Sequence, residues 1–436
     1  MTGEHRETVN RRHLLYGGAA AALAGTGIAA YAGGAWDSSA ADTADPAHPG
    51  PANHPGYVDV VADFGAKGDG HTDDSAAFAA AYAYAESRAA GGTGRTVIDV
   101  PPGVFRITKP YAFIDANKPT RQVNGLRFRG AGLRISDIVF DPPNASDAYL
   151  CRNIDTWQNI AFEGLRFTSA TPGASFFYSY STGGAANYRF SDCEWMGEWE
   201  YGLALDGSNT NSEMRWEACR VGGAYRKAFL YSGLSLNSKN LEQQDQFLNY
   251  WFTDMNVTYE WGNFLEFPYG GSVTCRAGSY IITGRRPTPH PDYGFESAFF
   301  RFPRASHFDG AQRFHAEDIR FELRDPSVVV IDCAWNRGTV HFNDCDDTAH
   351  AFKDFSDDLR AHRYTIGANG PLVRYDSCQL VGAHQFRTAA NAKPPVCVRY
   401  DMCRFGSHPP AAFLALDEGQ GRDFVRFTDC IPAAGG

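Results

Sequence analysis

The stretch Phe190-Ser191-Asp192-Cys193 decides the fold, because its four-residue pattern returns along the rest of the chain. Each copy has an aromatic or apolar residue, two mostly polar or small residues, and then Cys or another small or apolar residue. The other clear copies are Trp216–Cys219, Phe252–Met255, Phe342–Cys345, Tyr375–Cys378, Tyr400–Cys403 and Phe427–Cys430. Weaker copies begin at Phe162 and Phe314.

The spacing of the copies is typical of a β-solenoid. Neighbouring final residues lie 26 positions apart from Cys193 to Cys219, 36 from Cys219 to Met255, and 25 from Cys378 to Cys403. A repeat of this length with strand-like alternation is one coil that buries its inner face against the next coil. Leucine-rich and ankyrin signatures are absent. We therefore predict an all-β, single-stranded parallel β-helix in which six of the ten cysteines are buried structural rungs.

Composition limits the partners. The 436 residues are 43% hydrophobic, which fits a protein with a real core. The formal net charge of −10 repels phosphate backbones, so we predict no nucleic-acid partner. No segment after the N-terminal region approaches the ~20 apolar residues of a membrane span, so we expect no membrane association of the mature protein. No cysteine and histidine spacing suits zinc, and we predict no metal ligand of that kind.

The N-terminal sequence is typical of an export signal. Paired arginines, Arg11 and Arg12, precede an Ala- and Gly-rich stretch, and Ala30-Tyr31-Ala32 provides a small-residue cleavage site. We predict a twin-arginine signal peptide over residues 1–32, a disordered Pro/Ala/Asp-rich linker over 33–56, and a β-helix domain over 57–436. The mature protein is then secreted.

Residues 58–107 contain two motifs that resemble those of a known superfamily. The first is Asp63-Phe64-Gly65-Ala66-Lys67-Gly68-Asp69-Gly70-His71-Thr72-Asp73-Asp74-Ser75, and the second, after an Ala-rich helix, runs from Val97 to Ile107. This segment resembles the N-terminal part of pectate-lyase-like proteins, which include polygalacturonases, pectate lyases and phage tailspikes. The resemblance implies a right-handed β-helix whose short N-terminal helix caps the first coil, with Asp73 or Asp74 at the start of that helix.

A register argument gives the candidate catalytic residues. Period-two alternation directs Leu203, Leu205, Leu230, Leu265, Phe267, Phe300 and Phe302 inward. The outward set then contains Asp206, Tyr231, Glu266 and Arg301 as candidate catalytic residues. Asp206 and Glu266 are expected two coils, or about 10 Å, apart, which suits the carboxylates of inverting glycoside hydrolysis. In a lyase, Arg301 would instead bind an acidic sugar while Tyr231 moves a proton.

Aromatic and cationic residues nearby are candidates for substrate binding. They lie on the outward face and in the adjoining segments 198–201, 225–227, 259–261 and 290–293: Tyr178, Tyr180, Trp199, Arg226, Lys227 and Trp261. A Ca²⁺ ion, if the protein uses one, would bind the acidic region of Asp344, Asp346, Asp347, Asp354, Asp357 and Asp358. A solvated acidic loop is the other interpretation of that region.

These patterns favour an exported carbohydrate-active enzyme that cleaves a polysaccharide, by hydrolysis or β-elimination, in a groove along the middle coils. The alternative is a non-catalytic glycan-binding or surface-attachment protein, because the same aromatic surface serves both functions. The pattern leaves the sugar, the linkage and the oligomeric state open.

Overall fold

The computed structural model divides the chain into two units, Met1–Asp45 and Pro46–Gly436. It describes residues 56–90, 96–118, 123–209, 211–233, 248–268, 270–303, 312–348, 359–389, 394–406, 413–417 and 421–431. The predicted signal peptide at 1–32 and residues 33–55 of the predicted linker lie outside the described residues. In the described part of the chain, no helix combines the length and the apolar character needed to cross a membrane.

The described part of the second unit contains one helix, α2 (Ser75–Ala90), and many short strands. The strands are β1 (Tyr57–Asp59), β2 (Asp69–Asp73), β3 (Thr96–Val100), β4 (Gly103–Ile107), β5 (Ile114–Ala116), β6 (Val123–Gly130), β7 (Ser136–Phe140), β8 (Tyr149–Ile154), β9 (Trp157–Glu163), β10 (Arg166–Thr182), β11 (Arg189–Ser191), β12 (Glu194–Asn209), β13 (Met214–Glu217), β14 (Arg220–Val221), β15 (Ala224–Ser232), β16 (Tyr250–Tyr259), β17 (Asn263–Glu266), β18 (Gly271–Ile282), β19 (Ser297–Phe302), β20 (Gln312–Leu323), β21 (Val328–Cys333), β22 (Thr339–Asn343), β23 (Asp346–Thr348), β24 (His362–Ile366), β25 (Leu372–Asp376), β26 (Gln379–Leu380), β27 (His384–Thr388), β28 (Val398–Asp401), β29 (Arg404–Phe405), β30 (Leu414–Leu416) and β31 (Val425–Thr428).

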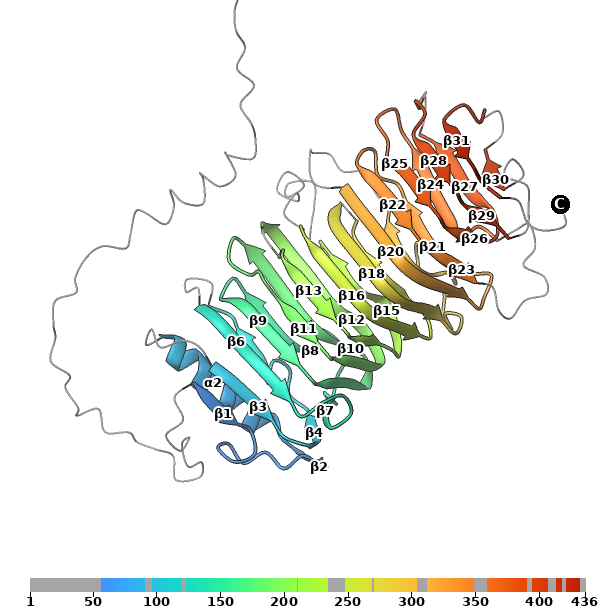
Figure 1. Cartoon of the computed structure of the whole chain (residues 1–436). Coiled ribbons are helices and arrows are strands. Elements are labelled where there is room, and N and C mark those ends of the chain that lie inside the picture. The colour runs from blue at the N-terminus through green and yellow to red at the C-terminus, as the bar shows by residue number, and fades with distance from the viewer. Residues whose placement is uncertain are drawn as a thin grey trace, which may run out of the picture. The chain divides into compact units, whose positions relative to one another are not determined.

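The strands pair in parallel along three faces, so the unit is a parallel β-helix whose coils follow one another in chain order (Figure 1). The first face runs through β1, β3, β6, β9, β11 and β13 to β22, β25, β28 and β31, and the second from β2, β4 and β7 to β23, β26 and β29. The third face contains β5, β8, the ends of β10 and β12, then β15, β17, β19, β21, β24, β27 and β30. The long strands β10, β12, β16, β18 and β20 cross from one face to the next.

The repeated four-residue pattern forms the corner between the first and second faces. Its third residue has a positive φ in every clear copy, for example 49° at Asp192, 53° at Ala218 and 50° at Asp429. The left-handed backbone region is open to Asp and Asn at lower cost than to most residues, which explains why Asp recurs there. The turn directs the aromatic residue before it and the cysteine after it into the same interior.

Stacked aromatic rings form the interior ladder that the repeat predicts. Phe162 stacks on Phe190 at 5.2 Å between centroids and Phe190 on Trp216 at 5.2 Å, and Trp216 stacks on Phe252 at 4.5 Å. The weaker copy at Phe314 is two residues out of register, because Ala316 rather than Phe314 pairs with Phe342. The ladder is therefore interrupted between Phe252 and Phe342, where Cys275 and Ala316 replace the ring in two successive coils.

The pattern's cysteines line the corner as free thiols. All ten cysteines of the chain, including the six of the pattern, are unpaired; nine are buried and Cys430 is half-buried. The Cys219 thiol donates to the Phe190 carbonyl at 3.4 Å, and the Cys403 thiol donates to the Tyr375 carbonyl at 3.4 Å. Each bond joins one coil to the coil before it, so the expected structural role of these residues agrees with their positions.

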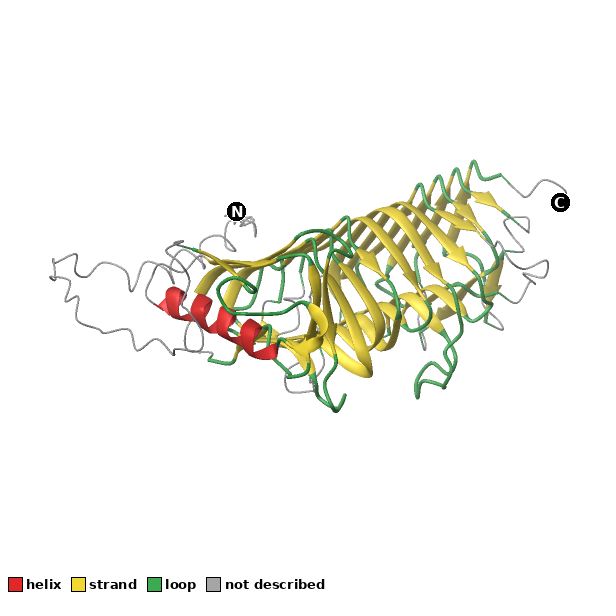
Figure 2. Ribbon diagram, turned by 90° about the horizontal axis from the view of Figure 1, so that it is seen from below, coloured by secondary structure: helices red, strands yellow, loops and turns green. Residues whose placement is uncertain are grey.

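Helix α2 covers the interior at the N-terminal end of the unit (Figure 2). Phe78 stacks on Phe113 at 4.8 Å between ring centroids, and the Trp157 indole N–H donates to the Tyr82 hydroxyl at 3.2 Å. The Asp73 side chain accepts the backbone N–H of Ser75, the first residue of the helix, at 3.1 Å, so it caps the start of α2, as predicted for Asp73 or Asp74. Asp74 instead accepts the N–H groups of the glycine-rich turn before the helix.

Candidate functional site

Three of the four predicted catalytic residues form one column on the third face. Tyr231 of β15 pairs with Glu266 of β17, and Glu266 pairs with Arg301 of β19. The predicted inward residues on these strands are fully buried: Leu203, Leu205, Leu230, Leu265, Phe267, Phe300 and Phe302. The column continues to Asp332 of β21.

The structure corrects the position of Asp206. Ala204, not Asp206, pairs with Tyr231, and Asp206 is the register partner of Tyr180. The offset of two residues displaces Asp206 by about 7 Å along the strand from the column of Tyr231 and Glu266. Asp206 is 3% exposed and accepts a hydrogen bond from the Tyr178 hydroxyl at 3.0 Å. Asp206 and Glu266 are therefore not placed as the acid and base pair that we expected.

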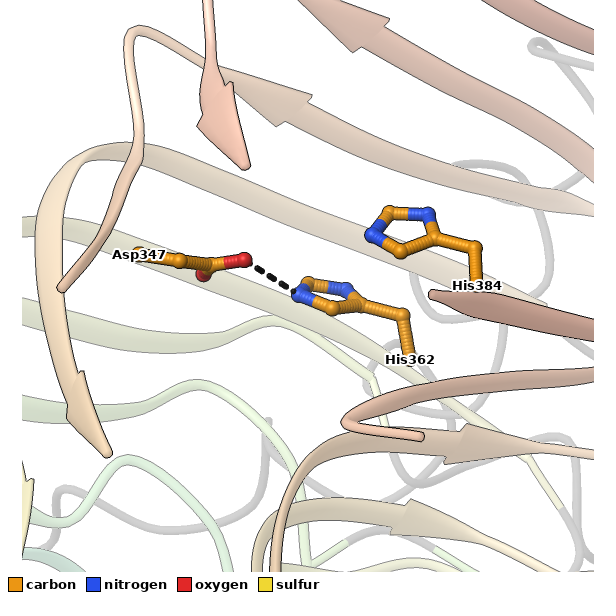
Figure 3. Close-up of side chains that lie close together, drawn as sticks. All are labelled: Asp347, His362 and His384. Carbon is orange, nitrogen blue, oxygen red and sulfur yellow. Dashed lines mark hydrogen bonds and ion pairs between the residues drawn. The ribbon is translucent and has the colours of Figure 1, made fainter. Parts of the chain in front are cut away.

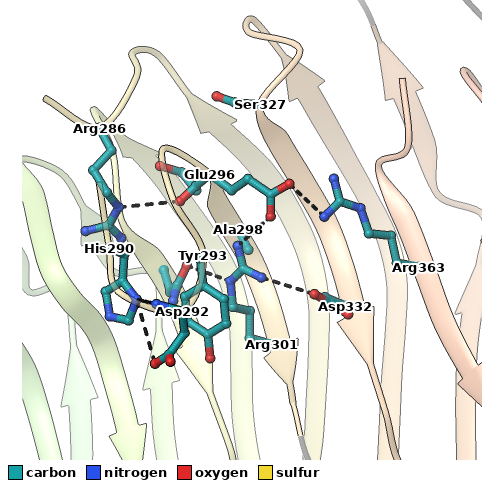
Figure 4. A network of polar contacts seen from close by, with 12 residues as sticks. Arg286, His290, Asp292, Tyr293, Glu296, Ala298, Arg301, Ser327, Asp332 and Arg363 are labelled. Atoms are coloured by element: carbon teal, nitrogen blue, oxygen red, sulfur yellow. Dashed lines mark hydrogen bonds and ion pairs between the residues drawn. The ribbon is translucent and has the colours of Figure 1, made fainter. Parts of the chain in front are cut away.

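A loop also covers the column, which we had expected to face solvent. Glu266 is only 6% exposed and Arg301 only 1%. The covering segment is 283–296, between β18 and β19, and its Tyr293 ring lies 3.8 Å from the Arg301 guanidinium carbon (Figure 4). Alternation predicts which face of the strand a side chain occupies, but it does not predict what packs over that face.

Both oxygens of the buried Glu266 carboxyl are hydrogen-bonded. Tyr293 donates to Oε1 at 2.8 Å, and the side-chain amide of Asn263 donates to Oε2 at 2.7 Å. Burial raises the pKa of Glu266, whereas the hydrogen bonds from Tyr293 and Asn263 and the charge of Arg301 oppose that rise. Glu266 is consequently a fixed group beneath the loop.

Arg301 connects the same loop to the next coils. Its guanidinium donates to Asn263 Oδ1 at 3.1 Å, to Asp332 at 3.1 Å and to Glu296 at 3.4 Å. Glu296 also forms an ion pair with Arg363 at 2.7 Å (Figure 4). Because a buried cation needs partners of this kind, the network holds the loop at residues 293–296 against β19, β21 and β24.

A depression of about 380 Å³ lies beside this loop. Its walls combine two glutamates, three cations, one tryptophan and a proline-rich segment: Glu198, Glu200, Arg226, Lys227, Trp261, Arg286, Pro287, Thr288, Pro289, His290 and Pro291. The Arg286 guanidinium carbon lies 5.4 Å from the centre of the Trp261 ring. Among the described residues, the Lys227 ammonium has no hydrogen-bond or ion-pair partner.

A second depression, of about 480 Å³, shares Glu200 and Arg226 with the first. Its remaining walls come from β8, β10, β12 and the segment before β8, including Tyr149, Ser175 and Tyr201. Burial raises the pKa of Glu200, and the positive charges of Lys227 and Arg226 oppose the rise. A half-buried carboxyl therefore stands where the two depressions meet.

His290 provides a neutral imidazole at the edge of the first depression. Burial, together with the charges of Lys227 and Arg286, lowers its pKa to about 4. Its ring stacks on Tyr293 at 4.8 Å, and its Nδ1 accepts the backbone N–H of Asp292 at 3.1 Å. The proton of the neutral ring is therefore on Nε2, which makes that nitrogen a hydrogen-bond donor.

The predicted binding residues divide into exposed and buried groups. Trp199 is fully buried and packs edge-on against Phe176 at 6.4 Å, so its expected role in stacking on a sugar ring is wrong. Strand β12 turns that side chain into the core, because Trp199 sits where the strand crosses from the second face to the third. Trp261 is 8% exposed and lines the first depression.

The remaining predicted binding residues stay near the surface. Tyr178 and Tyr180 are half-buried on the outward face of β10. Arg226 is exposed and pairs with Glu198 at 2.6 Å, and Lys227 is half-buried. Sequence reasoning missed Glu200, Arg286 and His290 as site residues. Two of them lie in the segments 198–201 and 290–293 that were noted for their aromatics, but alternation alone did not select them.

Strand β23 places neighbouring aspartates of the acidic region considered for Ca²⁺ on opposite faces. Asp346 is exposed, whereas its neighbour Asp347 is buried and bonds to His362 at 2.9 Å. Asp354, Asp357 and Asp358 lie outside the described residues. The described carboxylates of this region therefore point in opposite directions and do not surround one cation.

Comparisons with known proteins agree with the fold. The profile of the family described as Rhamnogalacturonase A/epimerase, pectate lyase-like matches residues 57–154. This match confirms the resemblance of the N-terminal segment and, with the parallel pairing of the strands, the prediction of a pectate-lyase-like parallel β-helix. No curated protein has a sequence that matches this chain.

This chain is also similar, at low sequence identity, to several solved structures. DFA-IIIase from Arthrobacter chlorophenolicus A6 is 12% identical with a TM-score of 0.47, and the match covers 87% of this chain and 93% of that one. An exopolygalacturonase from Thermotoga maritima is 12% identical with a TM-score of 0.44, covering 88% and 93%. The A-module of a mannuronan C-5 epimerase from Azotobacter vinelandii is 13% identical with a TM-score of 0.43, covering 86% and 95%.

Proposed function

We propose that this chain, a parallel β-helix with the N-terminal segment of the pectate-lyase-like superfamily, is an exported carbohydrate-active enzyme that cleaves an acidic polysaccharide. The observation that carries the proposal is the meeting of the half-buried carboxyl of Glu200 with the unpartnered ammonium of Lys227 in the depression beside Trp261. The carboxylate of an acidic sugar provides an ion-pair partner for this ammonium, and a pyranose ring fits against an indole face.

Glu200 is the proton donor in the proposed reaction. Hydrolysis and β-elimination both release a sugar oxygen that needs a proton, and a carboxyl with a raised pKa holds that proton closer to neutral pH. The two depressions that share Glu200 extend to either side of it, so the bond to be cleaved would lie across this residue.

Cationic groups in the first depression bind and orient the substrate. Lys227 contacts the carboxylate of the sugar, and the neutral His290 donates a hydrogen bond from Nε2 to a sugar oxygen. Arg286 is buried behind them and its Nη1 donates to the Arg226 carbonyl at 2.8 Å, so it adds positive charge while it holds the wall in place. Glu266 and Arg301 position the covering loop and do not contact substrate.

The test is incubation of the purified protein with uronic-acid polymers and neutral glucans, with measurement of reducing ends and of ultraviolet absorbance from unsaturated products. New reducing ends from uronic-acid polymers alone support the proposal, and the absorbance identifies β-elimination. Cleavage of neutral glucans alone would overturn the acidic substrate. Binding of a polymer without any product would instead identify the glycan-binding protein that the sequence left as the alternative.

A further inference from the structure

Three polar side chains meet in the interior of the C-terminal coils, away from the depressions. They are Asp347 of β23, His362 of β24 and His384 of β27, and none is more than 1% exposed (Figure 3). One potential ligand atom from each residue lies within 4.8 Å of those of the other two. The neighbouring groups in this interior are aromatic, so three polar side chains here need a specific stabilising partner.

The fold brings the two histidines together. His362 and His384 begin their strands and are register partners, so their imidazole rings stack at 4.1 Å between centroids. Figure 3 shows both rings extending from their strands toward Asp347. His362 Nε2 and Asp347 Oδ2 are 2.9 Å apart. The carboxylate and the two rings thus converge from three different strands.

The second observation is an unsatisfied nitrogen. His384 is fully buried, and its Nε2 has no hydrogen-bond partner among the described residues. Its other nitrogen, Nδ1, lies 2.8 Å from the Tyr400 hydroxyl, and His362 Nδ1 lies 2.9 Å from the Tyr375 hydroxyl. Both rings therefore have a hydroxyl that fixes their orientation through Nδ1, which is the arrangement found around histidines that bind a metal through Nε2.

We propose that Asp347, His362 and His384 bind a single divalent metal ion of the zinc type inside the C-terminal coils. Two imidazoles and one carboxylate are a donor set that suits zinc, and bonds of about 2.0–2.2 Å place neighbouring ligand atoms about 3.3 Å apart. Binding requires the two stacked imidazole rings to tilt so that both Nε2 lone pairs point at the ion. It also moves Asp347 Oδ2 and His362 Nε2 slightly apart from their present 2.9 Å. The ion joins two neighbouring coils, so its role is structural and independent of the proposed enzymatic activity.

Sequence reasoning predicted no such site, because its search used short ligand spacings. Asp347 and His362 are separated by residues 348–361, and His384 belongs to the next coil. Only the stacking of coils brings the three side chains together.

The experiment measures bound metal in the full chain, purified without a polyhistidine tag and dialysed against zinc. We expect about one zinc per chain in the wild type, retained in His341→Gln and lost in Asp347→Asn and His384→Gln. His341 is the matched control, because it also contacts an aspartate, Asp376, at 2.6 Å and a second histidine, His315, but lies at the surface. A wild type with no more zinc than the Asp347→Asn variant would overturn the proposal.

A second measurement uses only the wild type, in case a variant does not fold. Removal of the ion by a chelator should lower Tm, and addition of Zn²⁺ alone should restore it. Co²⁺ added in place of zinc should give the visible absorption of a cobalt ion with protein ligands. A Tm that does not respond to chelator or zinc, together with no cobalt absorption, contradicts the site whatever the variants do.

Discussion

The hydroxyl of Tyr293 donates a hydrogen bond to Oε1 of Glu266 at 2.8 Å, although Tyr293 belongs to the loop before β19 and Glu266 to β17. The same tyrosine ring lies against Arg301, so one side chain contacts both Glu266 and Arg301. The sequence predicts that the column of these two residues faces solvent. In the structure the contact buries it, and the column supports the loop that borders the first depression.

Removal of that hydroxyl should destabilise the protein. We expect Tyr293→Phe to lower the free energy of unfolding by about 1–3 kcal/mol, because a buried carboxyl loses one of its two donors. Urea unfolding near pH 7 measures the change. The control is Tyr84→Phe, which removes a hydroxyl that accepts a bond from Arg88 on the surface of α2. Equal effects of the two substitutions would contradict the buried bond.

Glu266 should make stability depend on pH. Burial raises its pKa above the ordinary value of 4.5, so the folded state holds this proton more tightly than the unfolded chain does. The stability gained from the protonated carboxyl is full below pH 4.5 and is lost as the pH rises through the folded pKa. The free energy of unfolding of the wild type minus that of Glu266→Gln, measured with urea at several pH values, should therefore decrease as the pH rises. An increase would refute this assignment.

Glu200 should control kcat and the loss of activity at alkaline pH. We expect Glu200→Gln to lower kcat by about 10²- to 10⁴-fold, since an amide cannot protonate the leaving oxygen. In the wild type, activity should fall as the pH rises through the raised pKa of Glu200, because the acid form is then lost. Glu217→Gln is the control, as Glu217 pairs with Arg189 on the first face. A Glu200→Gln variant with the wild-type rate would remove Glu200 from the mechanism.

Lys227 should act on substrate binding. Lys227→Gln removes the positive charge that contacts the sugar carboxylate, and we expect KM for a uronic-acid polymer to rise about tenfold with little change in kcat. Lys109→Gln, which alters an exposed lysine near β4, should leave KM unchanged. Initial rates over a range of polymer concentrations separate the two parameters, and a loss confined to kcat would argue against a binding role.

The buried thiols should be unreactive in the native protein. Burial raises the pKa of Cys151, Cys275 and Cys333, which disfavours the reactive thiolate. We expect a thiol reagent to modify at most the half-buried Cys430 before denaturation and all ten cysteines afterward. Rapid labelling of several thiols in the native protein would show that the corner packing is open.

Much of the fold can be read from the chain because its causes are local. The aromatic residue, the left-handed residue and the cysteine of a corner lie within four positions, so their spacing records most of the coils. The cap is also local, since Asp73 and the turn it closes lie beside α2. The prediction at Phe314 was wrong because two successive coils carry Cys275 and Ala316 at the position where the clear copies carry a ring.

The sequence by itself determined the coils, the interior ladder, the cap and the shared face of Tyr231, Glu266 and Arg301, since strand alternation and backbone turns depend on neighbouring residues. Only the tertiary structure decided that Asp206 is offset from this column, that Tyr293 buries it, and that Asp347, His362 and His384 converge. These outcomes depend on how many residues each corner and loop contains and on which coils stack. The residues involved lie on different coils, and alternation along a single strand does not predict contacts between coils.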